Sequence, residues 1–552
     1  MKKYLGAAIG NCVHVGGIVN FLRLAEEEGN QTEFLGAAVD IDKLIHAVLQ
    51  TKPDVVCIGF RLTPQSVIPL LDVLTNQIQE HHLESIAWLF GGTKPVAQIA
   101  KQYPFFSKIF DGTEDLDDVI NYLRGKNLKE ITSSYSQNII ERIHSKYPYP
   151  VLRHHFGLPS LEETYAGIQK IAAAKILDVI SIGPDQNAQE NFFTPEKMNH
   201  ALDGAGGVPL RTAGDFENLY KSSQTGNYPL LRCYSGTAEI FQFAQLLKDT
   251  IHNAWCAVPL CWYNVLDGRG PRPVHQSIEE GQQLMKWHGE RNIPVEVNEA
   301  HHWSLRDAHD TIGVAMAFLA AYNAKKMGVK DYVAQYMFNV PPSMHHKMDL
   351  AKMLAKIELI ESLQDTNFTT YRQVRAGLAS LSADLDVAKG QLAASTYLAM
   401  SIQPHIVHVV GFSEADHAAK PEDVIESCKI VRGVIRSTLH GTVDMGNDPI
   451  VQSRKKELIH EAKVLLNKIK ELYPENQDPW TDPIVLADVI KRGIIDAPHL
   501  RGNPSAKGTL ETRIIDGKCL AYSKSMNRHI SEEERLSTLL DSEDSPDQTI
   551  SA

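Results

Sequence analysis

The sequence lacks the signals of several large protein classes. Its seven cysteines form no CxxC pair, which argues against structural zinc and disulfide scaffolds and fits a reducing cytoplasm. No segment reaches the roughly 18–20 consecutive apolar residues of a membrane span, and the first apolar stretch is too short and too broken for a signal peptide. There is no basic run, and 55 basic against 67 acidic residues give a net charge of −12. We therefore expect neither a membrane nor a nucleic acid as partner.

Length and composition indicate a multidomain globular protein. The chain has 552 residues, of which 43% are hydrophobic and 22% are charged, and this supplies apolar material for several cores. At about 150 residues per domain, the length accommodates three or four domains, or one barrel with attachments.

Residues 1–125 alternate between strand-like and helical segments. The predicted strands are Tyr4–Ile9, Phe34–Val39, Val55–Gly59, Ile86–Phe90 and Lys108–Phe110. Helical periods follow them at 18–28, 41–49, 64–79, 95–101 and 116–123. This alternation predicts a doubly wound parallel sheet of flavodoxin-like size, which binds ligands at the carboxyl ends of its strands.

A polar segment, residues 126–150, is predicted to be a linker with one short helix around 138–144. From 151 to 448, strand-like runs recur with helical periods such as 311–327 and 347–364 between them. The runs are Val179–Ile182, Leu230–Arg232, Trp255–Leu260, Val295–Val297, Val333–Tyr336 and Ile406–Val410. About 300 residues of repeated β and α elements predict a (β/α)₈ TIM-type barrel.

Residues 449–552 are predicted to form a C-terminal extension. It begins with a charged amphipathic helix or helix pair at 449–473. It ends in an acidic, serine-rich segment at 532–552, which we expect to be a frayed tail.

Three short motifs follow predicted strands of the first domain. Gly10-Asn-Cys12-Val-His14-Val-Gly-Gly17 follows the first strand. Forty-two residues separate it from Phe60-Arg-Leu62, and twenty-eight more lead to Gly91-Gly92. Because parallel strands end at the same edge of a sheet, the three motifs converge on one edge.

These motifs resemble the cobalamin-binding domain, whose signature is D-x-H-x-x-G, S-x-L and G-G at these spacings. The resemblance implies that His14 is the lower axial ligand of cobalt. It also implies that the slot for the nucleotide tail is lined by Gly17, Leu62, Gly91 and Gly92. Two positions differ, since Cys12 stands where the family has Asp and Phe60 where it has Ser. Loss of such an outer carboxylate weakens a metal site by about 10–100-fold.

Two alternatives remain for this domain. Besides a working cobalamin site, it could be a retained flavodoxin-like sheet that has lost its ligand or a Rossmann-type dinucleotide-binding domain. The absence of GxGxxG disfavours the second.

The larger part of the chain resembles the catalytic subunit of glutamate mutase (methylaspartate mutase). The segments that carry this resemblance are Pro229–Arg232 with Gly236-Thr237, Tyr263–Val265, Ala315–Tyr336, Gly493–Pro498, Asn503, Ala506–Gly508 and Arg513. In that family the barrel pairs with a separate cobalamin subunit, so here both halves are on one chain. The resemblance also implies a homodimer.

The family holds its dicarboxylate with three arginines, because a guanidinium matches a carboxylate in two hydrogen bonds. Arg153 and Arg232 match two of them, and the third falls at 187–190, where no arginine occurs. Tyr263 matches one of two tyrosines and Asp267 stands at the other.

Two further positions depart from or match the family pattern. The glutamate that receives the substrate ammonium aligns with Ala257. Near the adenosyl group, Glu414 matches the family's glutamate, while Val410 replaces its lysine.

Structural explanations compete with several of these assignments. Arg232 at a strand end could only neutralise loop carboxylates, and Tyr263 could be a packed aromatic. Each of the histidine pairs at 154/155, 301/302 and 345/346 is expected to have one buried and one exposed member. Glu299 beside His301 is a candidate acid–base pair. Arg269 and Arg272 are either the missing anion ligands or solvated loop charges.

The sequence thus predicts an adenosylcobalamin-dependent carbon-skeleton isomerase that acts by radical rearrangement on a small carboxylic acid. The losses at Ala257 and at 187–190 argue that glutamate is not the substrate. The alternatives are a corrinoid-binding or regulatory protein without mutase activity, and a cobalamin-independent barrel lyase. The substrate and the pathway stay open at this point.

Overall fold

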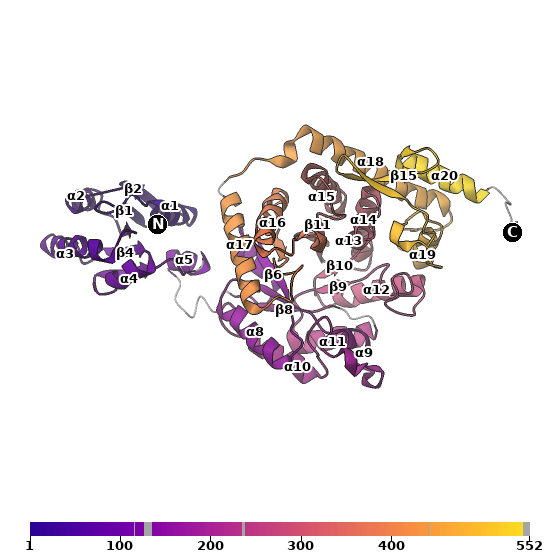
Figure 1. Cartoon of the computed structure of the whole chain (residues 1–552), viewed down its shortest axis with the longest axis horizontal. Helices are drawn as coiled ribbons and strands as arrows, with labels where there is room; N and C mark the ends of the chain where they lie inside the picture. Colours follow the sequence, from indigo (N-terminus) through magenta and orange to yellow (C-terminus); the bar gives the residue numbers. More distant parts are fainter. Residues whose placement is uncertain (115, 126–134, 235–237, 440, 545–552) are drawn as a thin grey trace. The chain divides into compact units, whose positions relative to one another are not determined.

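A computed structural model describes residues 1–114, 116–125, 135–234, 238–439 and 441–544 (Figure 1). The chain divides into two compact units, Met1–Ser134 and Tyr135–Ala552. Among the described residues, none of the helices has both the length and the apolar character that a membrane crossing requires.

The first unit is a five-stranded parallel sheet with the order β2-β1-β3-β4-β5. Its strands are β1 (Lys3–Ala8), β2 (Gln31–Phe34), β3 (Val55–Phe60), β4 (Ala87–Gly92) and β5 (Phe106–Phe110). Its helices are α1 (Gly16–Glu27), α2 (Ile41–Thr51), α3 (Pro64–Glu80), α4 (Lys94–Ala100) and α5 (Leu116–Leu123). This order confirms the predicted doubly wound sheet, and the order reverses between β1 and β3.

One predicted strand of this sheet was misplaced. The apolar run 34–39 was expected to be a strand, but β2 is the polar segment Gln31–Phe34 before it. β2 lies at the sheet edge and is largely accessible, so it needs no apolar run. The run that follows turns away at Gly36 and Ala38, whose φ angles of 119° and 52° are incompatible with a strand.

The second unit is built on an eight-stranded parallel barrel, which confirms the predicted fold class. The strands are β6 (Val151–Phe156), β7 (Val179–Ile182), β8 (Leu230–Arg232), β9 (Cys256–Val258), β10 (Val295–Val297), β11 (Asp331–Phe338), β12 (Thr369–Ala376) and β13 (Ile406–Val409). They pair in chain order, β13 pairs with β6, and a bridge between Tyr234 and Ala257 joins β8 to β9.

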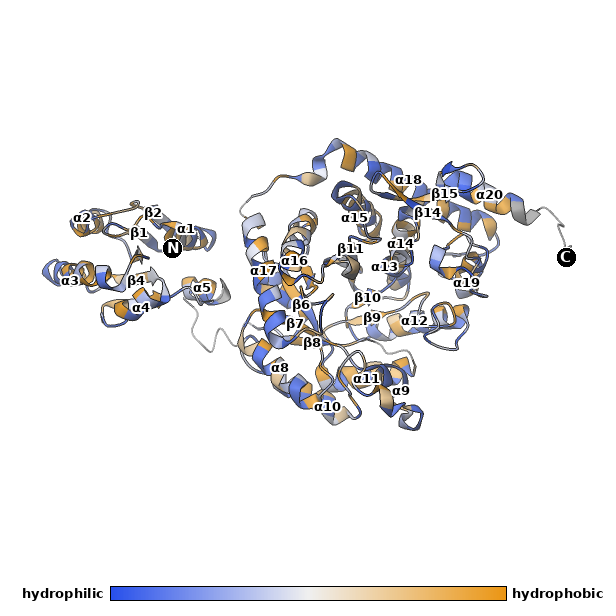
Figure 2. Cartoon of the chain, viewed as in Figure 1, coloured by the Kyte–Doolittle hydropathy of each residue, from blue (hydrophilic) through white to orange (hydrophobic). Residues whose placement is uncertain are grey.

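Helices surround this barrel, and their sequences mix hydrophilic and hydrophobic residues (Figure 2). They are α8 (Leu161–Ala173), α9 (Gln186–Asn191), α10 (Ala213–Ser223), α11 (Ile240–Ile251), α12 (Val274–Gly289), α13 (Ala300–Ser304), α14 (Asp310–Lys326), α15 (His346–Glu361), α16 (Leu385–Ala399) and α17 (Pro421–Leu439). The most buried of them, α14, is apolar on nearly every side and was predicted almost exactly at its limits.

Helix α7 (Ile139–Lys146) covers the amino-terminal end of the barrel. Its Ile139 and Ile143 pack with the first residues of several strands, among them Val151, Val179 and Leu230. The short helix predicted in the linker is therefore present, and it belongs to the barrel unit. The apolar layer beneath leaves the opposite, carboxyl-terminal end of the barrel as the place for polar side chains.

The C-terminal region packs against the barrel core. A single helix, α18 (Pro449–Leu472), lies along α14 and α15, and its Arg454 pairs with buried Asp310 at 3.1 Å. Beyond it come α19 (Pro483–Lys491), the antiparallel strands β14 (Thr512–Ile515), β15 (Lys518–Ser523) and β16 (Arg528–His529), and α20 (Glu532–Asp544).

The expectation of a frayed tail from residue 532 was wrong for its first part. Helix α20 is anchored by Glu532, which is buried and pairs with Arg535 at 2.6 Å and with His309 at 3.2 Å. The acidic, serine-rich composition of the segment gave no sign that Glu532 is buried and paired. Residues 545–552 lie outside the described part of the chain.

Candidate functional site

The three motifs of the first unit lie at one edge of its sheet. β1 pairs with β3, and β3 pairs with β4, so the loops after these strands are neighbours. Buried Cys12 links two of the loops, because its Sγ accepts a hydrogen bond from the backbone N–H of Arg61 at 3.4 Å. This edge lies at the reversal of strand order, where open α/β sheets bind ligands.

His14 is exposed in the loop before α1. Its Nδ1 lies 3.9 Å from the Sγ of Cys12, which leaves Nε2 accessible. A Cβ added at Gly16 or Gly17 would meet no atom within 4 Å, so the space beside His14 is open. Leu62 is 38% exposed at the end of β3.

Gly91 and Gly92, the third of the three motifs, lie at the end of β4. A Cβ on Gly92 would lie 2.8 Å from the carbonyl oxygen of Phe60, so the neighbouring backbone is in close approach. Phe60 itself is 1% exposed and belongs to the core of the sheet.

His14 suits the binding of a corrinoid, whereas Cys12 and Phe60 support such binding only weakly. The accessible imidazole of His14 is a suitable axial ligand for cobalt. The thiol of Cys12 is a weaker acceptor than the carboxylate that would orient and polarise the ring. Phe60 offers no hydrogen bond to a nucleotide tail.

Inside the barrel, two buried arginines share one carboxylate. Glu296 on β10 is 1% exposed, and its Oε2 lies 3.1 Å from Nη2 of Arg232 on β8 and 3.6 Å from Nη1 of Arg153 on β6. Trp255 donates its Nε1–H to the same oxygen at 2.8 Å. Since β6 and β10 are four strands apart in a ring of eight, these contacts cross the barrel interior.

Arg153 is the more fully satisfied of the two arginines. Its Nε donates to Ser181 Oγ at 2.6 Å and its Nη1 to Gln373 Oε1 at 2.9 Å. Its Nη2 lies 3.0 Å from Nε2 of His155, which also receives the hydroxyl of Tyr234 at 3.0 Å. Two donors on Nε2 place the proton of His155 on Nδ1.

The pKa values report an interior with excess positive charge. Burial and the nearby Arg232 lower the pKa of Arg153 to about 9. Burial would raise the pKa of Glu296, but Arg232 and Arg153 together lower it below its usual value. Burial and the arginines also lower the pKa of His155 and His408 well below the usual range, so both rings are neutral.

Unused donors remain in this interior. Arg232 is 0% exposed, yet its Nε and Nη1 have no hydrogen-bond partner among the described residues. Arg375, at the carboxyl end of β12, makes only a long Nε contact of 3.4 Å to the carbonyl of Ala376 and no ion pair within the described chain. Buried guanidinium nitrogens without acceptors are costly, so an anionic ligand is the natural complement.

Sequence reasoning identified Arg153 and Arg232 but missed Glu296 and Arg375. The structure brings all four to one interior, although the role of each as a substrate ligand stays a prediction. A signal for Arg375 existed, because Gln373 and Arg375 alternate with apolar residues as strand positions of one face do.

Tyr263 and Asp267 lie together in the loop after β9. Asp267 accepts the backbone N–H groups of Tyr263 and Asn264 at 3.2 and 3.0 Å and pairs with Arg306 at 3.7 Å. Asp267 therefore organises this loop. Tyr263, with a φ of 65°, presents its ring to Arg269 at 4.8 Å, and burial raises its pKa to about 12.

Glu414 follows β13 and is exposed. Its pKa is raised by desolvation, and the charge of Arg375 acts in the opposite direction. Ala257 is buried in β9 and carries no polar group toward the interior. The motif residues Gly236 and Thr237 lie outside the described residues.

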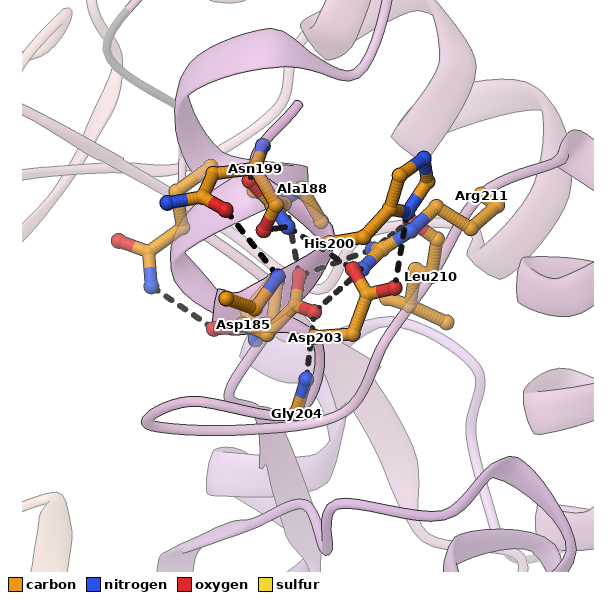
Figure 3. A network of polar contacts seen from close by, with 12 residues as sticks. Asp185, Ala188, Asn199, His200, Asp203, Gly204, Leu210 and Arg211 are labelled. Atoms are coloured by element: carbon orange, nitrogen blue, oxygen red, sulfur yellow. Dashed lines mark hydrogen bonds and ion pairs between the residues drawn. The ribbon is translucent and has the colours of Figure 1, made fainter. Parts of the chain in front are cut away.

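The segment where a third arginine was expected lies in α9, within a tightly hydrogen-bonded stretch between β7 and α10 (Figure 3). Asp185 is fully buried and accepts the N–H groups of Ala188 and Gly204 at 2.8 and 2.9 Å. Arg211 adds a two-pronged ion pair to Asp185, at 2.9 and 2.6 Å. Asn187 is likewise buried, and its side chain exchanges two hydrogen bonds with the backbone of Asn199. This segment therefore has a structural role.

The stretch between β7 and α10 also contains short 3-10 turns, and others occur elsewhere in the unit. They are Pro195–Lys197, His200–Leu202, Leu378–Ser380, Met400–Ile402, Met445–Asn447 and Pro498–Leu500.

The predictions for the histidine pairs were partly wrong. His154 and His155 do point apart, with His154 buried behind the strand and His155 in the interior. His301 and His302 are both buried, and 345/346 are both exposed. α13 places both rings of 301/302 against protein, whereas 345/346 begin α15 at the surface.

Glu299 and His301 do not form the expected pair. Glu299 accepts the N–H of Cys261 at 3.1 Å and the indole of Trp303 at 2.7 Å, and burial raises its pKa to about 7. His301 instead contacts Gln335 at 3.0 Å.

Arg269 and Arg272 have different neighbours. Arg272 pairs with Glu280 on α12, as a structural residue does. Arg269 stays 46% exposed beside Asp267.

No family model matches the chain, and no curated protein matches it. A cobalamin-binding protein from Desulfitobacterium hafniense DCB-2 aligns with 23% of this chain and 59% of its own length, at 18% identity and a TM-score of 0.20. OxsB, a cobalamin-dependent S-adenosylmethionine radical enzyme solved in its apo form, aligns with 98% of this chain and 80% of its own, at 11% identity and a TM-score of 0.18. Both are described as cobalamin proteins. The likenesses are distant and assign no specific function.

Proposed function

We propose that this protein is an adenosylcobalamin-dependent carbon-skeleton isomerase that acts on a small carboxylic acid. The observation that carries the proposal is the pair of unpartnered, fully buried guanidinium nitrogens of Arg232. They sit at the carboxyl end of a barrel strand, the end that carries active sites in this architecture.

The first unit supports the cofactor part of the proposal. Exposed His14 stands beside open space at Gly16 and Gly17, at the reversal of strand order. When bound, adenosylcobalamin supplies radical chemistry through reversible homolysis of its cobalt–carbon bond. The protein's part is to hold the cobalt through His14 and to place the substrate.

The barrel residues have distinct tasks in this proposal. Arg232 and Arg375 bind and orient the anionic part of the substrate, at one or two acidic groups. Arg153 and Glu296 hold Arg232 in position, because Glu296 accepts a hydrogen bond from one of the three guanidinium nitrogens of Arg232. Neutral His155 and Tyr234 form a hydrogen-bonded pair that adds no charge.

Exclusion of water follows from the packing. The apolar layer above α7 closes one end of the barrel, and Arg153, Arg232 and Glu296 are each at most 2% exposed. A reactive intermediate formed at such a site is shielded from solvent.

The experiment is a spectral titration of the full chain with adenosylcobalamin. We expect the wild type to shift the cofactor to its base-off spectrum and His14→Ala to lose the shift. His46→Ala is the matched control, because His46 is also exposed but lies on α2. Identical spectra for wild type and His14→Ala would refute the cofactor assignment.

A cobalamin-independent barrel enzyme is the second candidate. The thiol of Cys12 beside His14 and the apolar Phe60 favour it, since neither supplies the hydrogen bonds of a corrinoid site. This candidate predicts no spectral change with the cofactor, together with unaltered binding of carboxylic acids to the barrel. A protein that binds the cofactor but gives no radical signal with any carboxylic acid would be a corrinoid-binding or regulatory protein.

A further inference from the structure

The barrel interior holds more positive charge than its buried carboxylate neutralises, with Arg153 and Arg232 buried and Arg375 half-buried. Arg153, Arg232 and Arg375 come from three strands, and Glu296 is the buried strand carboxylate that faces them. Three guanidinium groups against one carboxylate leave a surplus of two charges. A surplus in a desolvated interior calls for a ligand with two negative charges.

Among the described residues, this interior offers no buried carboxylate that is free to pair with an ammonium group. Glu296 already receives Trp255 and Arg232 and lies beside Arg153. Glu299, just after β10, already accepts hydrogen bonds from Cys261 and Trp303.

Two other groups complete this picture. Glu414 is exposed, and Arg375 is the charge that acts on it. The histidines nearest the arginines, His155 and His408, are neutral and contribute no negative charge. An ammonium placed in this interior would face guanidinium groups without a partner of its own.

The unused donors reach the interior from two different strands. Arg232 is the last residue of β8, and Arg375 is the second-last residue of β12. These strands are four apart in a closed ring of eight, so they form opposite walls. Side chains from opposite walls can meet, as Arg153 and Glu296 do at 3.6 Å, so Arg232 and Arg375 can grip one small ligand from two sides.

We propose that the substrate is a small dicarboxylic acid without an amino group, with one carboxylate on Arg232 and the other on Arg375. This assignment rests on the proposed function, because it names the substrate class of the same barrel. It makes Arg375 the second anchor.

The test measures ligand binding to the full chain by calorimetry, without corrinoid. The probes are succinate, glutarate and adipate, each matched to its 2-amino counterpart (L-aspartate, L-glutamate, L-2-aminoadipate), with butyrate and inorganic phosphate as single anions. We expect at least one dicarboxylate to bind about tenfold or more tightly than its amino counterpart, because the added ammonium would be unpaired.

Variants locate the second anchor. Arg375→Met should weaken the preferred dicarboxylate at least about tenfold and leave butyrate unchanged, since butyrate needs only Arg232. Arg372→Met is the matched control on the same strand, because Arg372 faces outward and pairs with Glu361 at 2.6 and 2.9 Å. If Arg375→Met does not fold, Arg375→Lys, which keeps the charge but not the guanidinium group, replaces it in the same measurement.

Several outcomes would overturn the proposal. One is that each amino acid binds as tightly as its matched dicarboxylate or more tightly. The others are that phosphate binds more tightly than every dicarboxylate, that butyrate binds as tightly as the dicarboxylates, or that no dicarboxylate binds. Because corrinoid is absent from this assay, its result is independent of the titration of His14. A wild type that binds dicarboxylates but not cobalamin would retain this inference and refute the isomerase.

Discussion

Replacing Glu296 by glutamine tests whether one carboxylate holds the barrel interior together. The substitution keeps the shape of the side chain and removes the charge that faces Arg232 and Arg153. All three side chains are at most 2% exposed, so solvent cannot compensate for the loss. Breaking a buried pair by removing one partner costs about 3–5 kcal/mol.

The loss should depend on pH in a defined direction. The pKa of Glu296 in the folded protein lies below its unfolded value of 4.5, because Arg232 and Arg153 more than offset the raising effect of burial. A group with a lowered folded pKa contributes stability above its unfolded pKa and loses it as the pH falls through the folded value. The difference between wild type and Glu296→Gln should therefore be full at pH 7 and shrink below pH 4.5.

The assay is urea unfolding followed by tryptophan fluorescence at pH 7 and at pH 3.5–4. Five of the six tryptophans belong to the barrel unit, so the signal reports chiefly on that unit. Glu290→Gln is the control, because Glu290 is exposed and pairs with Arg291 only at 3.6 Å. A loss below about 1 kcal/mol for Glu296→Gln at pH 7, or one that grows toward acid, would refute the role of this carboxylate.

Two further predictions concern the loops. Asp185→Ala removes the acceptor of Ala188, Gly204 and Arg211, and we expect a loss of about 3 kcal/mol and faster proteolysis of residues 183–212. Exposed Gln186→Ala should do neither. Cys12→Asp restores a carboxylate beside His14 and should tighten adenosylcobalamin about tenfold in the titration, whereas Cys12→Ser should not. Unchanged affinity with Asp would mean that Cys12 does not orient the ring.

The architecture could be predicted because hydrophobic periodicity dominates it. Four of the five strands of the first sheet and six of the eight barrel strands stand out as apolar runs, and α14 as a long apolar helix. The edge strand β2 did not, because an exposed strand needs no apolar run. α20 did not, because its anchor is the buried charge of Glu532 in an otherwise polar segment.

The two barrel strands that the sequence did not reveal are those with the most polar inner faces. β6 reads VLRHHF and β12 reads TTYRQVRA, and their inward positions hold Arg153, His155, Gln373 and Arg375. Polar residues on a barrel strand hide it from a search for apolar runs, and the same residues form the candidate site. In this barrel, the strands that lack an apolar pattern are therefore the ones that carry the candidate functional residues.

The charge balance of the site could not be deduced from the sequence at all. Glu296 lies 64 positions from Arg232 and 143 from Arg153 along the chain, and it lies in a three-residue strand otherwise composed of valine. Only closure of the barrel brings the three groups together and leaves, among the described residues, Arg375 without an ion pair and two nitrogens of Arg232 without acceptors. The resemblance pointed to arginines and to a missing ammonium partner. The fold adds that the remaining buried carboxylate is already engaged, and this favours an acid without an amino group.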